Sequence, residues 1–182
     1  MFMQSIKKPC RIGLIEVYTG EGRGKTTAAF GLALRAVGHG MNVCIIQFMK
    51  YGDYGEIKAV ERLKPNLKVV QFGNGFINKY NIKNEDLINA RKAIDYARKA
   101  ILEGSYDIVI LDEVNIALSL KLIDLNEVIN ILKNKPSHVE IILTGRYAPK
   151  EIIEIADLVT EFKEVKHPFK NKNLNARPGI EY

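Results

Sequence analysis

The chain has 182 residues, of which 47% are hydrophobic and 26% are charged. This composition indicates a folded globular protein, because a disordered chain has too few apolar residues to form a core. No apolar run approaches the roughly 20 residues that span a bilayer, and the first residues lack the apolar stretch of an export signal. We therefore expect one cytoplasmic domain over residues 1–182, with an N-terminal arm at 1–10 and a basic tail at 163–182.

The charge of the chain points to an anionic ligand. Its 27 Lys and Arg exceed its 21 Asp and Glu, a net charge of +6. An excess of this size suits either nucleic acid or a small anion. The basic residues are not interleaved with aromatic ones, as they would be in a groove that binds single-stranded nucleic acid. We expect a small anionic molecule as the ligand, with neither nucleic acid nor a membrane as partner.

Apolar, β-rich runs alternate with helical patterns along the chain. The predicted strands are 12–18, 42–48, 67–72, 107–111, 139–143 and 158–162, and the predicted helices are 25–37, 56–63, 84–103, 125–133 and 149–155. Several strand runs are continuously apolar, which is typical of strands covered on both faces. Alternation of this kind predicts right-handed crossovers and a three-layer α/β domain with a mainly parallel sheet of about six strands.

The segment TGEGRGKTT at 19–27 lies between a predicted strand and a predicted helix. This is the position of a phosphate-binding loop, in which glycines let backbone N–H groups converge on phosphate oxygens. Lys25 adds a positive charge there, and Thr26 is placed to bind Mg²⁺ through its hydroxyl. The pattern predicts a phosphate-loop NTPase-like fold, in a variant form with Thr19 at the usual first glycine. The residues expected to bind the nucleotide are Thr19, Gly20, Glu21, Gly22, Arg23, Gly24, Lys25, Thr26 and Thr27.

A second motif, DIVILDE at 107–113, is an apolar run that ends in two acids. An acid at the carboxyl end of a strand near a phosphate loop can bind a metal ion directly or through water. We expect Asp112 to act with Thr26 in binding the metal; the alternative is that Asp112 and Glu113 are solvated turn residues. Together the two motifs predict a nucleoside triphosphate and Mg²⁺, without specifying the reaction.

The sequence shows further motifs beyond the phosphate loop. Residues 20–40 read GEGRGKTTAAFGLALRAVGHG and are followed by QFMK at 47–50, LDEVN at 111–115, TGR at 144–146, ADLVTE at 156–161, VKHPF at 165–169 and GIE at 179–181. In these motifs, over nearly its whole length, the chain resembles the ATP:corrinoid adenosyltransferases of the phosphate-loop type.

The resemblance implies an enzyme that transfers the 5′-deoxyadenosyl group of ATP to cobalt(I) of a corrinoid and releases triphosphate. This reaction belongs to adenosylcobalamin biosynthesis or salvage. The resemblance also implies a homodimer with a six-stranded parallel sheet, and a nucleotide reversed in the loop so that C5′ faces the acceptor. An electron-donating flavoprotein or another reductase would supply cobalt(I). Cobalt(I) is itself a strong nucleophile, so no general base is expected.

The resemblance also implies roles for individual residues. Lys25 and Thr26 would be catalytic by neutralising the leaving triphosphate, and Glu113 would hold the ribose or the metal shell. Three cations would lie around the triphosphate or the corrinoid edge, unless they are ordinary surface charges: Arg35, Lys50 and Arg146.

Phe76 and Gln47 are the residues expected to contact the corrinoid. Phe76 would crowd the lower face and displace the axial ligand, which makes cobalt(II) easier to reduce; the alternative is that it packs in the core. Asn78 stands where the family often has Trp, and the chain contains no Trp. Tyr80 could take the place of that aromatic residue, or ligand displacement is weaker in this chain.

Two other functions fit the phosphate loop by itself. A kinase or NTPase would act on the γ-phosphate, with a residue such as Glu113 positioning the attacking group. A nucleotide-dependent binding module would use the basic tail, for example on nucleic acid. The products separate the enzymes, because adenosyl transfer releases triphosphate, whereas a kinase or NTPase releases ADP.

Overall fold

The computed structural model describes residues 12–75, 82–167 and 175–180 of the chain. Its strands form one sheet in the order β3-β2-β4-β5-β1-β6, and each neighbouring pair is parallel. The predicted α/β class with six parallel strands is thereby confirmed. The strands are β1 (Ile15–Thr19), β2 (Val43–Phe48), β3 (Leu67–Phe72), β4 (Ile108–Asp112), β5 (Glu140–Thr144) and β6 (Leu158–Glu161).

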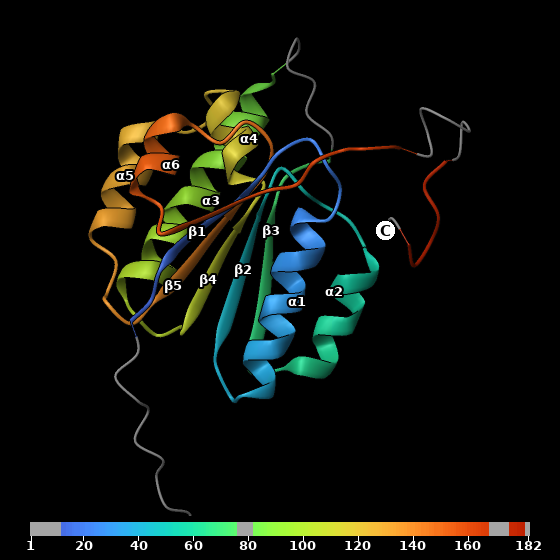
Figure 1. Ribbon diagram of the computed structural model, residues 1–182, viewed down its shortest axis with the longest axis horizontal. Coiled ribbons are helices and arrows are strands. Elements are labelled where there is room, and N and C mark those ends of the chain that lie inside the picture. The colour runs from blue at the N-terminus through green and yellow to red at the C-terminus, as the bar shows by residue number, and fades with distance from the viewer. Residues whose placement is uncertain (1–11, 76–81, 168–174, 181–182) are drawn as a thin grey trace, which may run out of the picture.

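Helices cover both faces of the sheet, which gives the three layers that the alternating pattern predicts (Figure 1). One face carries α1 (Lys25–Gly38) and α2 (Gly55–Val60), and a short 3₁₀ turn, η1 (Glu61–Leu63), follows α2. The other face carries α3 (Asn84–Leu102), α4 (Val114–Ser119), α5 (Leu125–Lys133) and α6 (Lys150–Ile155). None of the described helices combines the length and apolar character of a membrane span.

Apart from one-residue shifts at helix ends, the helices differ from prediction in two places. The predicted helix at 56–63 ends as an α-helix at Val60 and finishes in the 3₁₀ turn. Helix α4 is not predicted, because its six residues are too few to show a helical period. Helix α3 begins at Asn84 as predicted, and its N-cap is Lys83, whose N–H donates to the Asp86 carboxylate at 2.9 Å.

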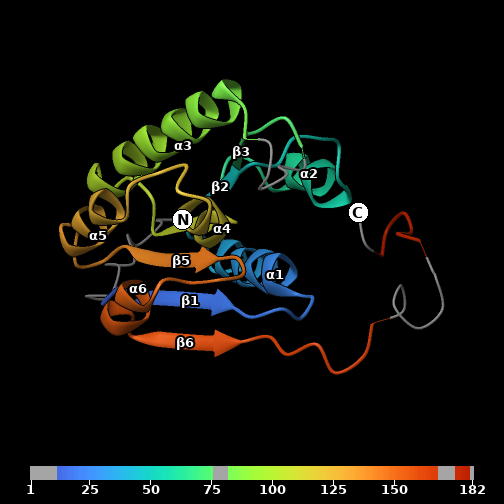
Figure 2. The ribbon, with the colours of Figure 1, turned by 90° about the horizontal axis from the view of Figure 1, so that it is seen from above.

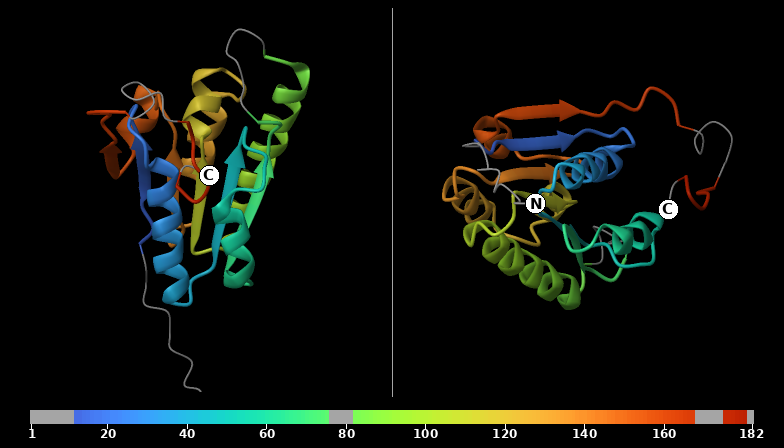
Figure 3. Two further views of the ribbon diagram at one scale, coloured as in Figure 1. Left: turned by 90° about the vertical axis from the view of Figure 1, so that its right-hand side faces the viewer. Right: turned by 90° about the horizontal axis from the view of Figure 1, so that it is seen from below.

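The centre of the sheet is buried and one of its edges is not. Strands β2, β4 and β5 are buried at every residue, as continuous apolar runs predict for strands covered on both faces. Strand β6 is exposed at every residue, because it is the edge strand beside β1. Seen from above and from below, the strands run side by side in one direction (Figures 2 and 3). Their carboxyl ends therefore meet at one edge of the sheet.

Candidate nucleotide-binding site

The phosphate loop connects β1 to α1 at this carboxyl edge. Gly24 precedes the helix with φ of 115°, a conformation that glycine adopts without strain. The Lys25 side chain folds back over the loop, and its Nζ donates to the carbonyls of Gly20 at 2.6 Å and Gly22 at 2.7 Å. Burial lowers the pKa of Lys25. The loop therefore forms a closed turn around an ammonium group.

Two of the loop glycines are required by contact with the backbone of Phe162, the residue that follows β6. A Cβ on Gly20 would lie 2.5 Å from the Phe162 carbonyl oxygen, and one on Gly22 would lie 2.7 Å from it. The Gly22 N–H donates to this same oxygen at 2.6 Å. The loop glycines are predicted to bind phosphate through their N–H groups, but the N–H of Gly22 is already used within the protein.

A row of polar side chains crosses the carboxyl ends of four neighbouring strands. The Gln71 amide donates to Gln47 at 2.9 Å, and the Gln47 amide donates to Asp112 at 2.9 Å. From the other side, the Thr144 hydroxyl donates to Asp112 at 2.7 Å. Gln47, Asp112 and Thr144 are fully buried. We call these four side chains, Gln71, Gln47, Asp112 and Thr144, the carboxylate row.

Asp112 connects the carboxylate row to the phosphate loop. The Thr26 hydroxyl donates to Asp112 at 2.8 Å, and the Lys50 ammonium contacts both Asp112, at 2.8 Å, and the Thr26 oxygen, at 2.9 Å. Burial by itself would raise the pKa of Asp112. The Lys50 charge and the hydrogen bonds from Lys50, Thr144 and Thr26 outweigh burial and lower this pKa. Asp112 is therefore an ionised carboxylate with donors on both oxygens.

The pKa of Glu113, the next residue, is shifted in the opposite direction. Glu113 precedes α4 with φ of 65°, and its Oε2 atom is buried with no hydrogen-bond partner among the described residues. Burial, and then the neighbouring Asp112 charge, raise the pKa of Glu113. Asn115 Oδ1 is a second buried acceptor without a described partner. Adjacent carboxyl groups with opposite pKa shifts are suited to different tasks: Asp112 holds positive charge, and Glu113 has a buried oxygen open to a further hydrogen bond.

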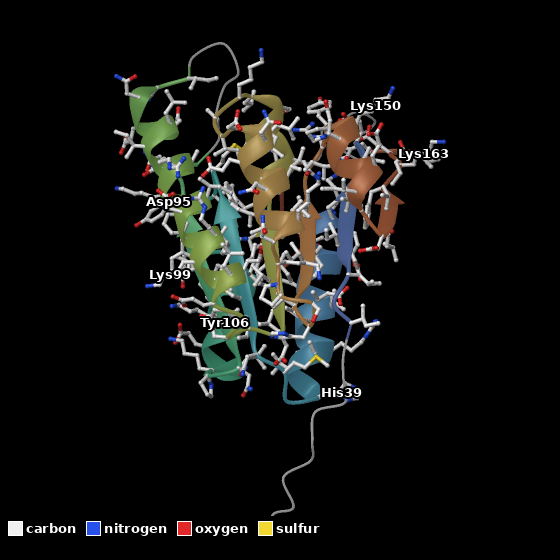
Figure 4. All side chains as sticks on the ribbon, turned by 90° about the vertical axis from the view of Figure 1, so that its left-hand side faces the viewer. His39, Asp95, Lys99, Tyr106, Lys150 and Lys163 are labelled. Carbon is white, nitrogen blue, oxygen red and sulfur yellow. The ribbon has the colours of Figure 1, made fainter. Side chains whose placement is uncertain are left out.

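The remaining predicted cations lie in different places. Arg146 lies beside the phosphate loop and contacts Glu21, with 3.3 Å between the guanidinium and the carboxylate. Arg35 is exposed in the last turn of α1, ten residues and about 15 Å along the helix from Lys25. Figure 4 shows His39, just past this helix end, at the opposite end of the molecule from Lys163, which follows β6. The structure does not bring Arg35 to the loop.

Three further predicted residues are absent from the cavity lining as described: Gln47, Thr19 and Phe76. Gln47 is fully buried and both ends of its amide are used, so it supports Asp112 and has no surface for the expected corrinoid contact. The Thr19 hydroxyl accepts the Ala148 N–H at 3.3 Å, which ties the end of β1 to the loop after β5. Phe76, expected to face the corrinoid, lies outside the described residues, as do Asn78 and Tyr80.

A cavity of about 630 Å³ lies at the phosphate loop. The end of the phosphate loop, the start of α1, the start of α2, Lys50 and Glu113 contribute to its lining. Residues near the C-terminus complete the lining. The lining residues are Arg23, Gly24, Lys25, Thr26, Thr27, Phe30, Lys50, Tyr54, Gly55, Glu56, Glu113, Gly179 and Ile180.

The roles of Gln71, Thr144 and Phe162 are not predicted from the sequence. A signal was present for the first two, because each of the four neighbouring strands β3, β2, β4 and β5 turns polar at or near its last residue. The runs IIQF, VVQF, IVILD and IILT place Gln47, Gln71, Asp112 and Thr144 at matching registers. Phe162 contacts the loop through its backbone, and its ring centroid lies 6.0 Å from Lys25 Nζ. The sequence gave no signal for these contacts, because they join the end of the last strand to a loop that is distant in the sequence.

The fold and the site define a class of protein. A phosphate loop after the first strand of a parallel sheet, with a buried acid ending a nearby strand, is characteristic of phosphate-loop nucleotide-binding proteins. Residues 11–182 match the family model described as ATP:corrinoid adenosyltransferase BtuR/CobO/CobP, and the chain belongs to this family. The predicted family is confirmed, and with it the activity: ATP-dependent transfer of an adenosyl group to a corrinoid.

Individual relatives agree with the family match. The chain is 41% identical to a corrinoid adenosyltransferase of Sinorhizobium sp over 175 residues, covering 93% of this chain and 80% of that protein. It is 37% identical to one of Escherichia coli strain K12 over 172 residues, covering 93% of this chain and 86% of that protein. It is 34% identical to one of Pseudomonas aeruginosa over 171 residues, covering 93% and 84%.

Proposed function

We propose that the cavity binds the triphosphate of ATP against the phosphate loop and directs C5′ toward the corrinoid. The cobalt(I) electron pair then forms a bond to C5′, and the electron pair of the C5′–O bond leaves with the triphosphate. This reaction needs an aligned C5′ and a neutralised leaving group. The observation that carries the proposal is that Arg23, Lys25 and Lys50 line one cavity. No histidine lies among the described lining residues, which suits a reaction that needs no base.

The donors at the loop suit Mg²⁺ as well. Mg²⁺ prefers oxygen ligands and in nucleotide sites takes one or two from the protein, the rest from phosphates and water. Thr26 Oγ1 and the Asp112 carboxylate are adjacent, and the Lys50 ammonium already contacts both, so this pair of residues accepts a cation. We propose that Thr26 and Asp112 would hold the metal, Asp112 through water. When bound, the metal would supply further positive charge to the leaving triphosphate.

Glu113 is proposed to contact the nucleoside. It lines the cavity, and its buried Oε2 atom has no hydrogen-bond partner among the described residues. A ribose hydroxyl can donate a hydrogen bond to that oxygen. This contact would position the sugar, and with it C5′.

The oligomeric state, the location in the cell and the electron donor are proposed from the family. We propose a homodimer in the cytoplasm that receives cobalt(II) corrinoid together with electrons from a flavoprotein or another reductase. Phe76 remains the residue proposed to crowd the lower corrinoid face, and Arg146 remains proposed near the triphosphate, where its contact with Glu21 places it beside the loop.

The test is incubation of the protein with ATP, Mg²⁺ and a chemically reduced corrinoid. We expect a light-sensitive cobalt–carbon bond to form in step with intact triphosphate, measured by absorbance and by chromatography of the spent nucleotide. The same incubation without corrinoid is the control, and it should leave ATP unchanged. ADP and phosphate as the products would contradict the proposal and support a kinase or NTPase.

A further inference from the structure

We propose that the C-terminal turn, residues Arg177–Ile180, is part of the nucleotide-binding site and contacts the nucleoside portion of ATP. The inference rests on the proposed function, since it takes the triphosphate to lie at the phosphate loop. The C-terminal turn is distant from the phosphate loop in the sequence: Arg23 and Ile180, which are in contact, are 157 positions apart.

The local sequence accounts for the shape of this turn. Pro178 follows Arg177, Gly179 has φ of 72°, and the Ile180 N–H donates to the Arg177 carbonyl at 3.2 Å. Proline at the second position and a glycine with positive φ at the third are the pattern of a type II turn. The turn therefore has a defined conformation, and its Ile180 side chain projects from a fixed backbone.

The structure places the C-terminal turn against the phosphate loop. The Arg23 guanidinium donates to the Ile180 carbonyl, and Gly179 and Ile180 line the same cavity as Lys25 and Thr26. Figures 1 and 3 show the segment beside α2, next to the gap between α1 and α2. The turn thus forms an exposed, outer part of the cavity wall.

The two ends of the cavity differ in chemistry. Lys25, Thr26 and Lys50 offer charge and hydrogen bonds at the inner end. Phe30, Tyr54 and Ile180 offer aromatic and apolar surface elsewhere in the lining. Ile180 is 54% exposed, so much of its side chain is available to a ligand. A nucleoside triphosphate also has a charged part and an apolar part: the phosphates carry the charge, and the base is flat and largely apolar. With the triphosphate at the loop, the nucleoside is the part that meets Ile180.

The test compares ATP with inorganic triphosphate, each titrated into the full chain by calorimetry. Ile180→Ala removes apolar contact area and should weaken ATP binding roughly tenfold, with inorganic triphosphate binding unchanged. Ile88→Ala on α3 is the matched control, because Ile88 is also 54% exposed and lies outside the cavity lining. Gly179→Val is a second variant. Its Cβ would meet nothing within 4 Å, so it strains only the turn, and it too should weaken ATP alone.

Each outcome bears on the inference. Equal weakening of ATP and inorganic triphosphate would overturn it, since the turn would then act through the phosphate loop. Unchanged ATP binding in both variants would also overturn it, including when corrinoid binding is weakened in its place. Failure of the unmodified protein to bind ATP would instead contradict the proposed function.

Discussion

The site has a buried part and an exposed part. The buried part, which we call the inner wall, is the set of side chains around Asp112, of which Thr26 and Lys50 line the cavity; Asp112 receives hydrogen bonds from Gln47, Thr144, Thr26 and Lys50. The exposed part, which we call the outer wall, lies beside the loop: Arg23 donates to the Ile180 backbone carbonyl, and Arg146 contacts Glu21 across 3.3 Å.

The two parts meet different needs: one keeps its shape without ligand, and the other can exchange its contacts when ligand binds. A buried, fully bonded carboxylate keeps its position whether or not ligand is present, because moving it would break several hydrogen bonds in a low-dielectric interior. Exposed single contacts each contribute little to stability, so they can be exchanged for contacts to ligand. We therefore expect changes at the inner wall to act on folding and changes at the outer wall to act on binding.

Asp112→Asn should produce the largest effect. It removes the charge that pairs with the largely buried Lys50 ammonium and places an NH₂ group against existing donors. Loss of one partner from a buried ion pair costs about 3–5 kcal/mol of the free energy of unfolding, measured by urea denaturation. Asp95→Asn on the α3 surface, where the carboxylate is 52% exposed, is the control and should change stability little. Equal costs for the two variants would contradict the distinction between the walls.

Lys25→Ala should lower stability less than Asp112→Asn does, because it removes two hydrogen bonds to loop carbonyls and no ion pair, and it should reduce the rate of adenosyl transfer. The ammonium is proposed to neutralise the leaving triphosphate, and loss of one such contact lowers the rate by roughly 10²–10³-fold. The measurement is cobalt–carbon bond formation with chemically reduced corrinoid, alongside the melting temperature. Lys99→Ala, a lysine 72% exposed on α3, should retain the full rate. A folded Lys25→Ala enzyme with most of its activity would refute the assigned role.

Gly22→Ala tests whether the loop depends on the Phe162 backbone. Its Cβ would lie 2.7 Å from the Phe162 carbonyl, so the loop or the end of β6 must shift, at a cost of about 2 kcal/mol. The matched control is Gly31→Ala in α1, where a Cβ would meet nothing within 4 Å. That change should raise stability by about 0.5–1 kcal/mol, because alanine favours the helix. Chemical denaturation of both variants decides the point, and equal shifts would show that the loop does not depend on this close approach.

Glu113→Gln should produce the smallest effect, and one that depends on pH. The pKa of Glu113 is raised in the folded protein, so its destabilising contribution is absent below the ordinary value of 4.5 and grows as the pH rises through the folded pKa. The variant should therefore match the unmodified protein near pH 4 and exceed its stability at pH 8, by on the order of 1 kcal/mol. Glu103→Gln, at an exposed site, should show no such divergence. A Glu113→Gln difference that stays constant across pH would contradict the raised pKa.

Much of this architecture could be predicted because its signals are local. The apolar runs of β2, β4 and β5 depend on neighbours in the sequence. Helix α4 could not be predicted, since six residues after a strand show no period. The burial of Gln47 and the distance of Arg35 from the loop could not be predicted either. Whether a polar side chain faces a ligand or the interior depends on which strands lie beside it, and that is a property of the sheet order.

By itself the sequence determined the parallel α/β class, the phosphate loop, the acid that ends β4 and the family, because each is written in a contiguous motif. Only the tertiary structure decided how these parts meet. The order β3-β2-β4-β5-β1-β6 brings Gln71, Gln47, Asp112 and Thr144 into register and leaves β6 as the edge that contacts Gly20 and Gly22. It also brings Ile180 to Arg23. The physical reason is that hydrogen bonds and close packing act between atoms adjacent in space, and adjacency across the sheet is created by folding.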